Sequence, residues 1–332
     1  MPKTLRLFPV LVATIALLLS SGCAPDAGGG AGSGRLQVVA AFYPLQFLAE
    51  RVGGDHTEVT SLTEPGVEPH DLELTPRQVG SIGSAGLVVY QSGFQASVDE
   101  AVAQSGNEQT LDMTTVVPPV PVTEHEGHEH GGHEHEEEGH EHEGEGHEEE
   151  GHEHEHEHGD IDPHVWLNPT NMITMAEAVA AKLSEIDPDN AAAYEANLAA
   201  LRTELTGLDT EFSTGLATCE RREFITSHAA FGYLASAYDL TQIAISGLSP
   251  DAEPSPARIG EVHAAAKEHG ITTIFYETLV SPAVAESIAG DLGLKTAVLD
   301  PLEGITPDSR GSDYVAVMKS NLAALQAANG CQ

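Results

Sequence analysis

Three histidines and one aspartate lie in separate turns of this sequence, and their side chains are of the types that bind a divalent metal. His70 lies in GVEPHDLELTP, His164 in DPHVWLNP, His228 in ITSHAAFGYLA and Asp300 in VLDPLEG. Three neutral imidazoles and one carboxylate form a plausible tetrahedral zinc set, with Zn–N bonds of about 2.0–2.1 Å. A single Pro-His or Ser-His dipeptide is usually a solvated loop, so only the joint placement of the four indicates a site.

A second metal-affine feature is the tract 124–158, which consists only of His, Glu and Gly and holds twelve of the 18 histidines. Without apolar side chains it cannot bury a core, so we expect it to be disordered. Its alternating imidazoles and carboxylates offer many weak sites, for nickel or copper as well as zinc. The pattern favours capture or buffering of metal, and the alternative is an acidic solubilising segment.

The overall charge agrees with a cation-binding role. The chain has 332 residues and a formal net charge of −38. Such a surface repels nucleic acid and attracts cations, so we expect no nucleic-acid partner. An enzyme is a possible alternative, but the sequence lacks an HExxH helix, and four protein ligands would leave no open position for an activated water. We therefore expect no catalytic residues.

The N-terminus resembles an export signal. Lys3 and Arg6 precede the apolar run 7–19, which is too short to span a bilayer comfortably and is followed by SSGC ending at Cys23. We interpret residues 1–22 as a signal peptide, Cys23 as a lipid-attachment site and 23–35 as a flexible tether, with plain secretion as the alternative. Either interpretation places the protein outside the cytoplasm, on the membrane by a lipid anchor or in the periplasm.

Two cysteines remain after this segment. Because disulfides persist outside the cytoplasm, we expect Cys219 and Cys331 to be bridged. Metal binding by this pair is less favoured, since no CxxC spacing occurs.

Short β-branched runs alternate with helical patterns, which predicts an α/β fold of two lobes with four parallel strands each. The strands are expected at 36–42, 57–62, 86–90 and 110–116, and at 222–226, 241–245, 271–276 and 295–299. The helices are expected at 45–52, 76–84 and 94–104, and at 229–238, 256–269, 282–291 and 310–329.

The lobes are joined by helical sequence. A helix opened by Asn168-Pro169 should extend to about residue 186, and a second should occupy 188–215 as one long, rigid helix of about 40 Å. The alternative is a break at Gly207. The expected organisation is an N-terminal lobe over 36–168 containing the loop 124–160, linking helices over 169–217 and a C-terminal lobe over 218–332.

This organisation brings the candidate ligands together. In open α/β sheets ligands bind beyond the carboxyl ends of the strands, so two facing lobes would place the four side chains in one cleft. The remaining histidines fit exposed positions: His56 lies in a turn, and His263 and His269 lie on a helix. Glu277, which follows the strand 271–276, is interpreted as an acceptor that orients a ligand imidazole, or as an ordinary solvated carboxylate.

The motifs around these residues, together with ISGLSPDAEPSP, resemble the metal-binding lipoproteins of bacterial ABC importers, the zinc/manganese solute-binding cluster. The resemblance covers about 36–330. It implies two lobes, a rigid connecting helix, a metal in the cleft, and delivery of that metal to a membrane permease and its ATPase. We expect a monomer.

The resemblance also implies the ligands and the metal. The family pattern maps onto His70, His164, His228 and Asp300, with water or Glu68 as the alternative fourth ligand. Zinc members carry His at the third position, where manganese members typically carry Glu, so His228 favours Zn²⁺. The remaining alternatives are a protein for manganese or another divalent metal, and a metal-buffering surface adhesin of the same fold.

Overall fold

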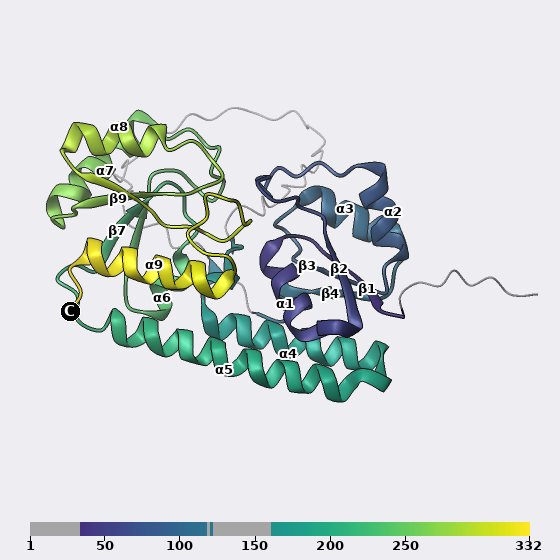
Figure 1. Cartoon of the computed structure of the whole chain (residues 1–332). Helices are drawn as coiled ribbons and strands as arrows, with labels where there is room; N and C mark the ends of the chain where they lie inside the picture. Colours follow the sequence, from purple (N-terminus) through teal and green to yellow (C-terminus); the bar gives the residue numbers. More distant parts are fainter. Residues whose placement is uncertain (1–33, 118–119, 122–160) are drawn as a thin grey trace, which may run out of the picture. The chain divides into compact units, whose positions relative to one another are not determined.

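The computed structural model describes residues 34–117, 120–121 and 161–332 (Figure 1). All the helices and strands below belong to one unit of the chain, Arg35–Gln332. The predicted signal peptide, Cys23 and the tract 124–158 lie outside the described residues. Among the helices of the described part, none has both the length and the apolar character that a membrane span requires.

The first lobe is built on a parallel sheet with the strand order β2-β1-β3-β4. Val38 pairs with Val59 on one side and with Leu87 on the other. The central strands are largely buried, as expected for a parallel sheet covered on both faces. The elements of this lobe are β1 (Leu36–Ala40), α1 (Tyr43–Gly53), β2 (Thr57–Ser61), α2 (Pro76–Ser84), β3 (Leu87–Tyr90), α3 (Ala96–Ser105) and β4 (Thr110–Asp112).

The second lobe has a similar parallel sheet, with the order β10-β9-β7-β8. Its elements are β7 (Glu223–Thr226), α6 (Gly232–Ala237), β8 (Thr241–Ala244), α7 (Pro256–Glu268), β9 (Thr273–Tyr276), α8 (Ala283–Leu292), β10 (Lys295–Val298) and α9 (Tyr314–Asn329). Figure 1 shows this lobe in green to yellow and the first in purple to blue. The two sheets confirm the predicted α/β class.

Two boundaries differ from the prediction because a side chain caps a helix. The strand expected to reach residue 116 ends at Asp112, whose carboxylate accepts the N–H of Thr114 and starts the 3₁₀ helix η2 (Met113–Thr115). The last helix begins at Tyr314 rather than at 310, because Asp313 accepts the N–H of Ala316.

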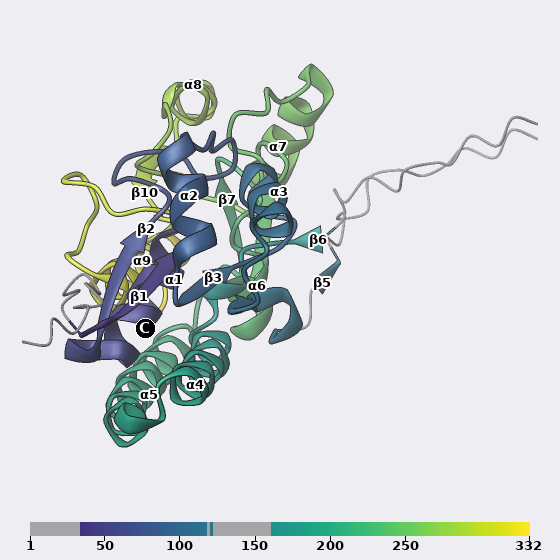
Figure 2. The ribbon, with the colours of Figure 1, turned by 90° about the vertical axis from the view of Figure 1, so that its right-hand side faces the viewer.

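Two linking helices, α4 (Pro169–Ile186) and α5 (Ala191–Gly215), run side by side along one side of both lobes (Figures 1 and 2). The first has the predicted bounds. The second is one helix of 25 residues, about 37 Å long at 1.5 Å per residue. It continues through Gly207 because buried residues on both sides of that position, Leu205 and Leu208, hold it in the core. The predicted single helix is therefore confirmed, and the break at Gly207 is wrong.

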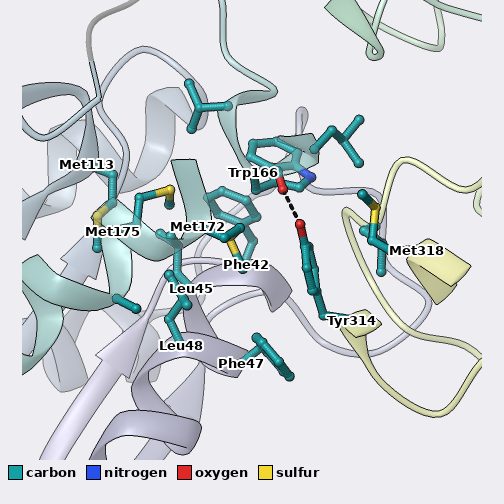
Figure 3. Close-up of a cluster of buried hydrophobic side chains, with 14 of the residues drawn as sticks. Phe42, Leu45, Phe47, Leu48, Met113, Trp166, Met172, Met175, Tyr314 and Met318 are labelled. Carbon is teal, nitrogen blue, oxygen red and sulfur yellow. Dashed lines mark hydrogen bonds between the residues drawn. The ribbon is translucent and has the colours of Figure 1, made fainter. Parts of the chain in front are cut away.

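Aromatic side chains join the two lobes in one core (Figure 3). Trp166 lies in the 3₁₀ helix η4 (Val165–Leu167) and packs against Phe42 with a ring-centroid distance of 4.9 Å. Its indole N–H donates to the carbonyl of Pro301 over 2.7 Å. Tyr314 of the second lobe donates its hydroxyl to the carbonyl of Trp166 over 2.7 Å and packs against Phe47 of α1. The region near Trp166 therefore contacts both lobes.

Two further connections constrain the chain. A short antiparallel pair, β5 (Val120–Pro121) and β6 (Ile161–Asp162), brings together the two ends of the segment that contains the His/Glu tract (Figure 2). This pair was not predicted, since two-residue strands carry no periodic signal. A disulfide joins Cys219 and Cys331, which are 112 residues apart, and ties the end of α9 to the segment that precedes β7.

Candidate metal centre

The loop between β2 and α2 presents His70 from the first lobe. The carboxylate of Glu68 accepts the N–H of His70, with Oε1 and Oε2 at 3.1 and 3.0 Å, and the N–H of Asp71 at 3.4 Å. Glu68 therefore shapes the turn that carries the imidazole. Burial raises the pKa of Glu68 to about 7, although the hydrogen bond from the His70 N–H opposes the shift.

His164 lies two residues after the end of β6 and is completely buried. Its main-chain N–H donates to Oδ1 of Asp162 over 2.9 Å, and its Nδ1 lies 2.8 Å from the same oxygen. The carboxylate of Asp162 thus fixes both the backbone and the ring, and turns Nε2 of His164 away from it. A ligand imidazole is commonly oriented in this way by a carboxylate on its other nitrogen.

His228 follows β7 in the second lobe, and its ring is held by Glu277 from the end of the neighbouring strand β9. Nδ1 of His228 lies 2.7 Å from Oε1 of Glu277, which also accepts the hydroxyl of Ser227 over 2.9 Å. Gln242 of β8 donates to the carbonyl of His228 over 2.9 Å. The structure therefore pairs Glu277 with His228. Glu277 is only 2% exposed, so it is not an ordinary solvated carboxylate.

Glu303, in the loop after β10, is the carboxylate that meets the three imidazoles. Its Oε1 lies 3.3 Å from Nε2 of His70, 3.1 Å from Nε2 of His164 and 3.3 Å from Nε2 of His228. The side chains of His164, His228 and Glu303 are at most 1% exposed, and that of His70 is 12% exposed. Both lobes therefore contribute to one buried cluster.

The spacing within the cluster suits a tetrahedral metal. The four ligand atoms lie within 4.8 Å of one another. Bonds of about 2.0 Å in a tetrahedron place neighbouring ligand atoms about 3.3 Å apart, close to the distances from Glu303 to the imidazoles. Oε2 of Glu303 and Nε2 of His228 are buried and have no hydrogen-bond partner among the described residues. Such buried polar atoms need a partner, and a metal ion bound between the four residues would satisfy them.

Asp300, the predicted fourth ligand, lies three residues from Glu303 but has a different set of contacts. Its carboxylate accepts the N–H of Leu302 over 2.8 Å and the hydroxyl of Thr278 over 3.2 Å. Its main chain is bound by Asn321 through both the N–H and the carbonyl. Leu302 has a φ of 61°, so these contacts hold a left-handed turn that directs the chain toward Glu303.

Glu303 and Asp162 are therefore the site residues that the sequence reasoning missed. Glu303 is in the quoted segment VLDPLEG, and Asp162 precedes Pro-His in DPHVWLNP. The available signal was the repeat of an acidic residue two positions before a histidine, in Glu68-Pro-His70 and Asp162-Pro-His164. The alternative ligand Glu68 shapes its turn and does not join the described cluster of three histidines and Glu303.

The other histidines of the described chain lie outside the cluster. His56 is in a 3₁₀ turn, η1 (Gly54–His56), against Tyr194, and His269 caps α7 near Glu223. His263 lies within α7.

Charge governs the protonation of the cluster. Burial opposes ionisation of Glu303, but its close contacts with the three imidazoles hold its pKa well below the usual range. Burial likewise lowers the pKa of His228, but the carboxylates of Glu277 and Glu303 outweigh it and raise the pKa to about 10. His164 is shifted in the same direction by Asp162 and Glu303. Without a metal, protons on the imidazoles therefore balance the negative charge of the carboxylates.

Two lobes that jointly enclose three imidazoles and a carboxylate define a two-lobed metal-binding protein. The chain matches the family model described as "Zinc-uptake complex component A periplasmic" (ZnuA) over residues 38–328. It belongs to this family, which confirms the resemblance drawn from the motifs. The description of this family names a component of a zinc-uptake complex, which agrees with the expectation that the chain is not an enzyme.

Individual relatives support the assignment. The chain is 36% identical over 320 residues to the "High-affinity zinc uptake system protein ZnuA" of Bacillus subtilis (strain 168), covering 96% of this chain and 95% of the relative. It is 35% identical over 318 residues to the "Zinc-binding lipoprotein AdcA" of Streptococcus pneumoniae, covering 94% of this chain and 60% of that longer relative. The crystal structure of the Zn(II)-bound ZnuA-like domain of Streptococcus pneumoniae AdcA matches with a TM-score of 0.70 and 32% identity, over 89% of this chain and 99% of that chain.

Substitution at two positions distinguishes Glu303 from Asp300 as the fourth ligand. We expect Glu303→Gln to weaken zinc binding by more than about 100-fold, because it removes a charged ligand atom. This loss is larger than that caused by removing a hydrogen bond to a ligand from outside the cluster. Asp300→Asn retains an oxygen that can accept the N–H of Leu302, so its affinity should fall by less than about tenfold. Competition with a fluorescent chelator measures both, with exposed Glu195→Gln as the control. The reverse order would assign the ligand to Asp300.

The protonation of His228 predicts a pH dependence. Zinc must displace a proton from this imidazole, so the apparent affinity should rise by about tenfold per pH unit between pH 6.5 and 8.5. The folding stability of the metal-free protein should instead fall as the pH rises. The stability contributed by His228 is complete below pH 6.5 and is lost as the pH rises toward about 10. Chelator competition and metal-free thermal melts measure the two trends, and an affinity independent of pH would contradict the assignment.

Proposed function

We propose that the chain is an extracytoplasmic, high-affinity zinc-binding protein that delivers Zn²⁺ to the permease and ATPase of an ABC importer. The observation that carries this proposal is the convergence of three imidazole Nε2 atoms on Oε1 of buried Glu303, at 3.1–3.3 Å. The printed descriptions of the family and its relatives, which name zinc binding and zinc uptake, support the same function.

The donor set favours zinc over manganese. Imidazole suits Zn²⁺, whereas Mn²⁺ prefers a larger share of oxygen ligands. The proposed ligands are His70, His164, His228 and Glu303, and four protein ligands close a tetrahedral sphere. A closed sphere leaves no position for an activated water, so the cluster binds metal without hydrolytic chemistry.

The division of ligands between lobes supports delivery. His70 comes from the first lobe, whereas His228 and Glu303 come from the second. Movement of one lobe against the other would therefore break the sphere and release the ion. An importer needs such a route, because a metal held by buried ligands leaves slowly unless the ligands separate. The adhesin alternative is not favoured, since the descriptions above concern zinc binding and uptake.

The remaining parts of the proposal concern location and the tract. Lipid attachment at Cys23 would hold the protein on the outer face of the membrane, next to its permease. The tract 124–158 would capture or buffer metal in many weak sites, because its twelve histidines lie close along the sequence. The β5–β6 pair supports this, since it anchors both ends of that segment two residues before His164.

An uptake experiment tests the proposal as a whole. In cells that lack the gene for this chain, the unsubstituted protein should restore growth at limiting zinc, and Glu303→Gln should not. Glu195→Gln is the matched control, because it removes an equal charge from an exposed position. Equal growth with Glu303→Gln would exclude the cluster as the site that feeds the importer.

Deletion of residues 124–158 tests the role of the tract. Because the proposed tight ligands lie outside it, we expect one tight zinc site to remain while the total number of bound ions falls. Titration calorimetry of the full and shortened chains measures both quantities. Loss of the tight site on deletion would contradict this division between the cluster and the tract.

A further inference from the structure

The segment that links β3 to α3 holds both histidine-bearing turns of the first lobe through two buried glutamines. Gln95 donates its side-chain amide to the carbonyl of Pro69, over 3.1 Å. Gln91 donates its side-chain amide to the carbonyl of Pro163, over 2.5 Å. Each accepting proline immediately precedes a histidine of the cluster. Both glutamines are buried: Gln91 is 3% exposed and Gln95 is 2% exposed.

The same arrangement occurs at both turns. In the Pro69–His70 peptide, the oxygen accepts from Gln95 and from the N–H of Leu72, and the N–H of His70 donates to Glu68. In the Pro163–His164 peptide, the oxygen accepts from Gln91 and from the N–H of Val165, and the N–H of His164 donates to Asp162. Each peptide plane is thus fixed from both sides, by an amide on its oxygen and by a carboxylate on its N–H.

The glutamines are themselves placed on regular structure. Gln91 is the residue after β3, and Gln95 is the N-cap of α3, whose carbonyl accepts the N–H groups of Val98 and Asp99. Between them, the ring of Phe94 lies 4.7 Å from that of His70 and 6.2 Å from that of His164. One five-residue segment therefore sets the distance between two imidazoles that are 94 residues apart in sequence.

Their burial argues against a merely space-filling role. The amide oxygens of Gln91 and Gln95 are buried and have no hydrogen-bond partner among the described residues. An unsatisfied buried acceptor is unfavourable, and an apolar side chain of similar size would avoid it. The favourable part of each side chain is its amide N–H group. That of Gln91 reaches the carbonyl of Pro163, and that of Gln95 reaches both the carbonyl of Pro69 and the hydroxyl of Thr63, the latter over 3.0 Å. Being neutral, the amide also leaves the charge of the cluster unchanged.

We propose that Gln91 and Gln95 are positioning residues that pre-organise His70 and His164 as a two-histidine half-site on the first lobe. This proposal rests on the proposed zinc function, and it explains how part of the affinity for zinc arises. A fixed pair of imidazoles loses little conformational freedom when the ion binds, which raises the affinity. The second lobe then completes the sphere with His228 and Glu303.

The variants Gln91→Met and Gln95→Met test this, because methionine has a similar length and shape but no amide. Gln326→Met is the matched control, since Gln326 also donates its amide to a main-chain carbonyl, that of Gly215, over 3.1 Å. Zinc affinity is measured by chelator competition, metal-free stability by thermal melting, and the coordination geometry by the visible absorption of bound Co²⁺. If a methionine variant does not fold, Gln→Leu at the same position removes the amide with a smaller, neutral side chain.

We expect each site variant to weaken zinc binding by about 10–100-fold and to change the Co²⁺ spectrum, as for loss of an outer contact to a ligand. The Gln326→Met protein should keep the affinity and spectrum of the unsubstituted chain. An unchanged affinity and spectrum in the Gln91 and Gln95 variants would overturn the proposal. Glu303→Gln is measured alongside them. If it too binds zinc normally, the proposed function fails, whereas a loss confined to Glu303→Gln refutes only the positioning role.

Discussion

The structure depends on one buried interaction, the contact between the carboxylate of Glu303 and three imidazoles. A buried, isolated carboxylate is strongly unfavourable, so Glu303 requires positive charge around it. In the metal-free protein protons on the imidazoles provide that charge, and the pKa of His228 rises accordingly. A divalent cation can replace these protons at the same point without rearranging the carboxylate. The electrostatic requirement of one side chain thus makes the site both stable when empty and receptive to metal.

This interaction determines what the rest of the fold must do. Glu303 follows the edge strand of the second sheet, and His70 follows the edge strand of the first, so neither lobe can satisfy the carboxylate alone. The carboxyl ends of two parallel sheets must face one another, as ligand sites in open α/β sheets generally require. Carboxylates on the outer nitrogens of His164 and His228 then direct Nε2 of both rings inward. The linking helices and the shared aromatic core hold the two halves at that distance.

Much of this could be predicted from the sequence, and the failures have physical causes. Apolar runs and helix-start signals located the parallel strands and the bounds of α4, because these elements follow from local periodicity and capping. The three histidines were predicted from their joint placement in turns or loops, two of them after expected strands. Asp300 was predicted as the fourth ligand because it follows the strand 295–299 directly in sequence, and Glu303 was not among the candidates. The left-handed turn at Leu302, which advances the chain to Glu303, depends on contacts with Thr278 and Asn321 from distant segments.

Trp166 gives this architecture an optical consequence. It is the only tryptophan of the chain, so the ultraviolet emission of the protein is dominated by a single indole. The ring lies 5.2 Å from that of His164, and its N–H is bound to the carbonyl of Pro301 from the second lobe. Protonated imidazole nearby quenches indole fluorescence, and a broken hydrogen bond to Pro301 would shift its wavelength. The emission intensity would then report metal binding, and the emission wavelength would report separation of the lobes. Both signals could be followed in real time and without an added dye.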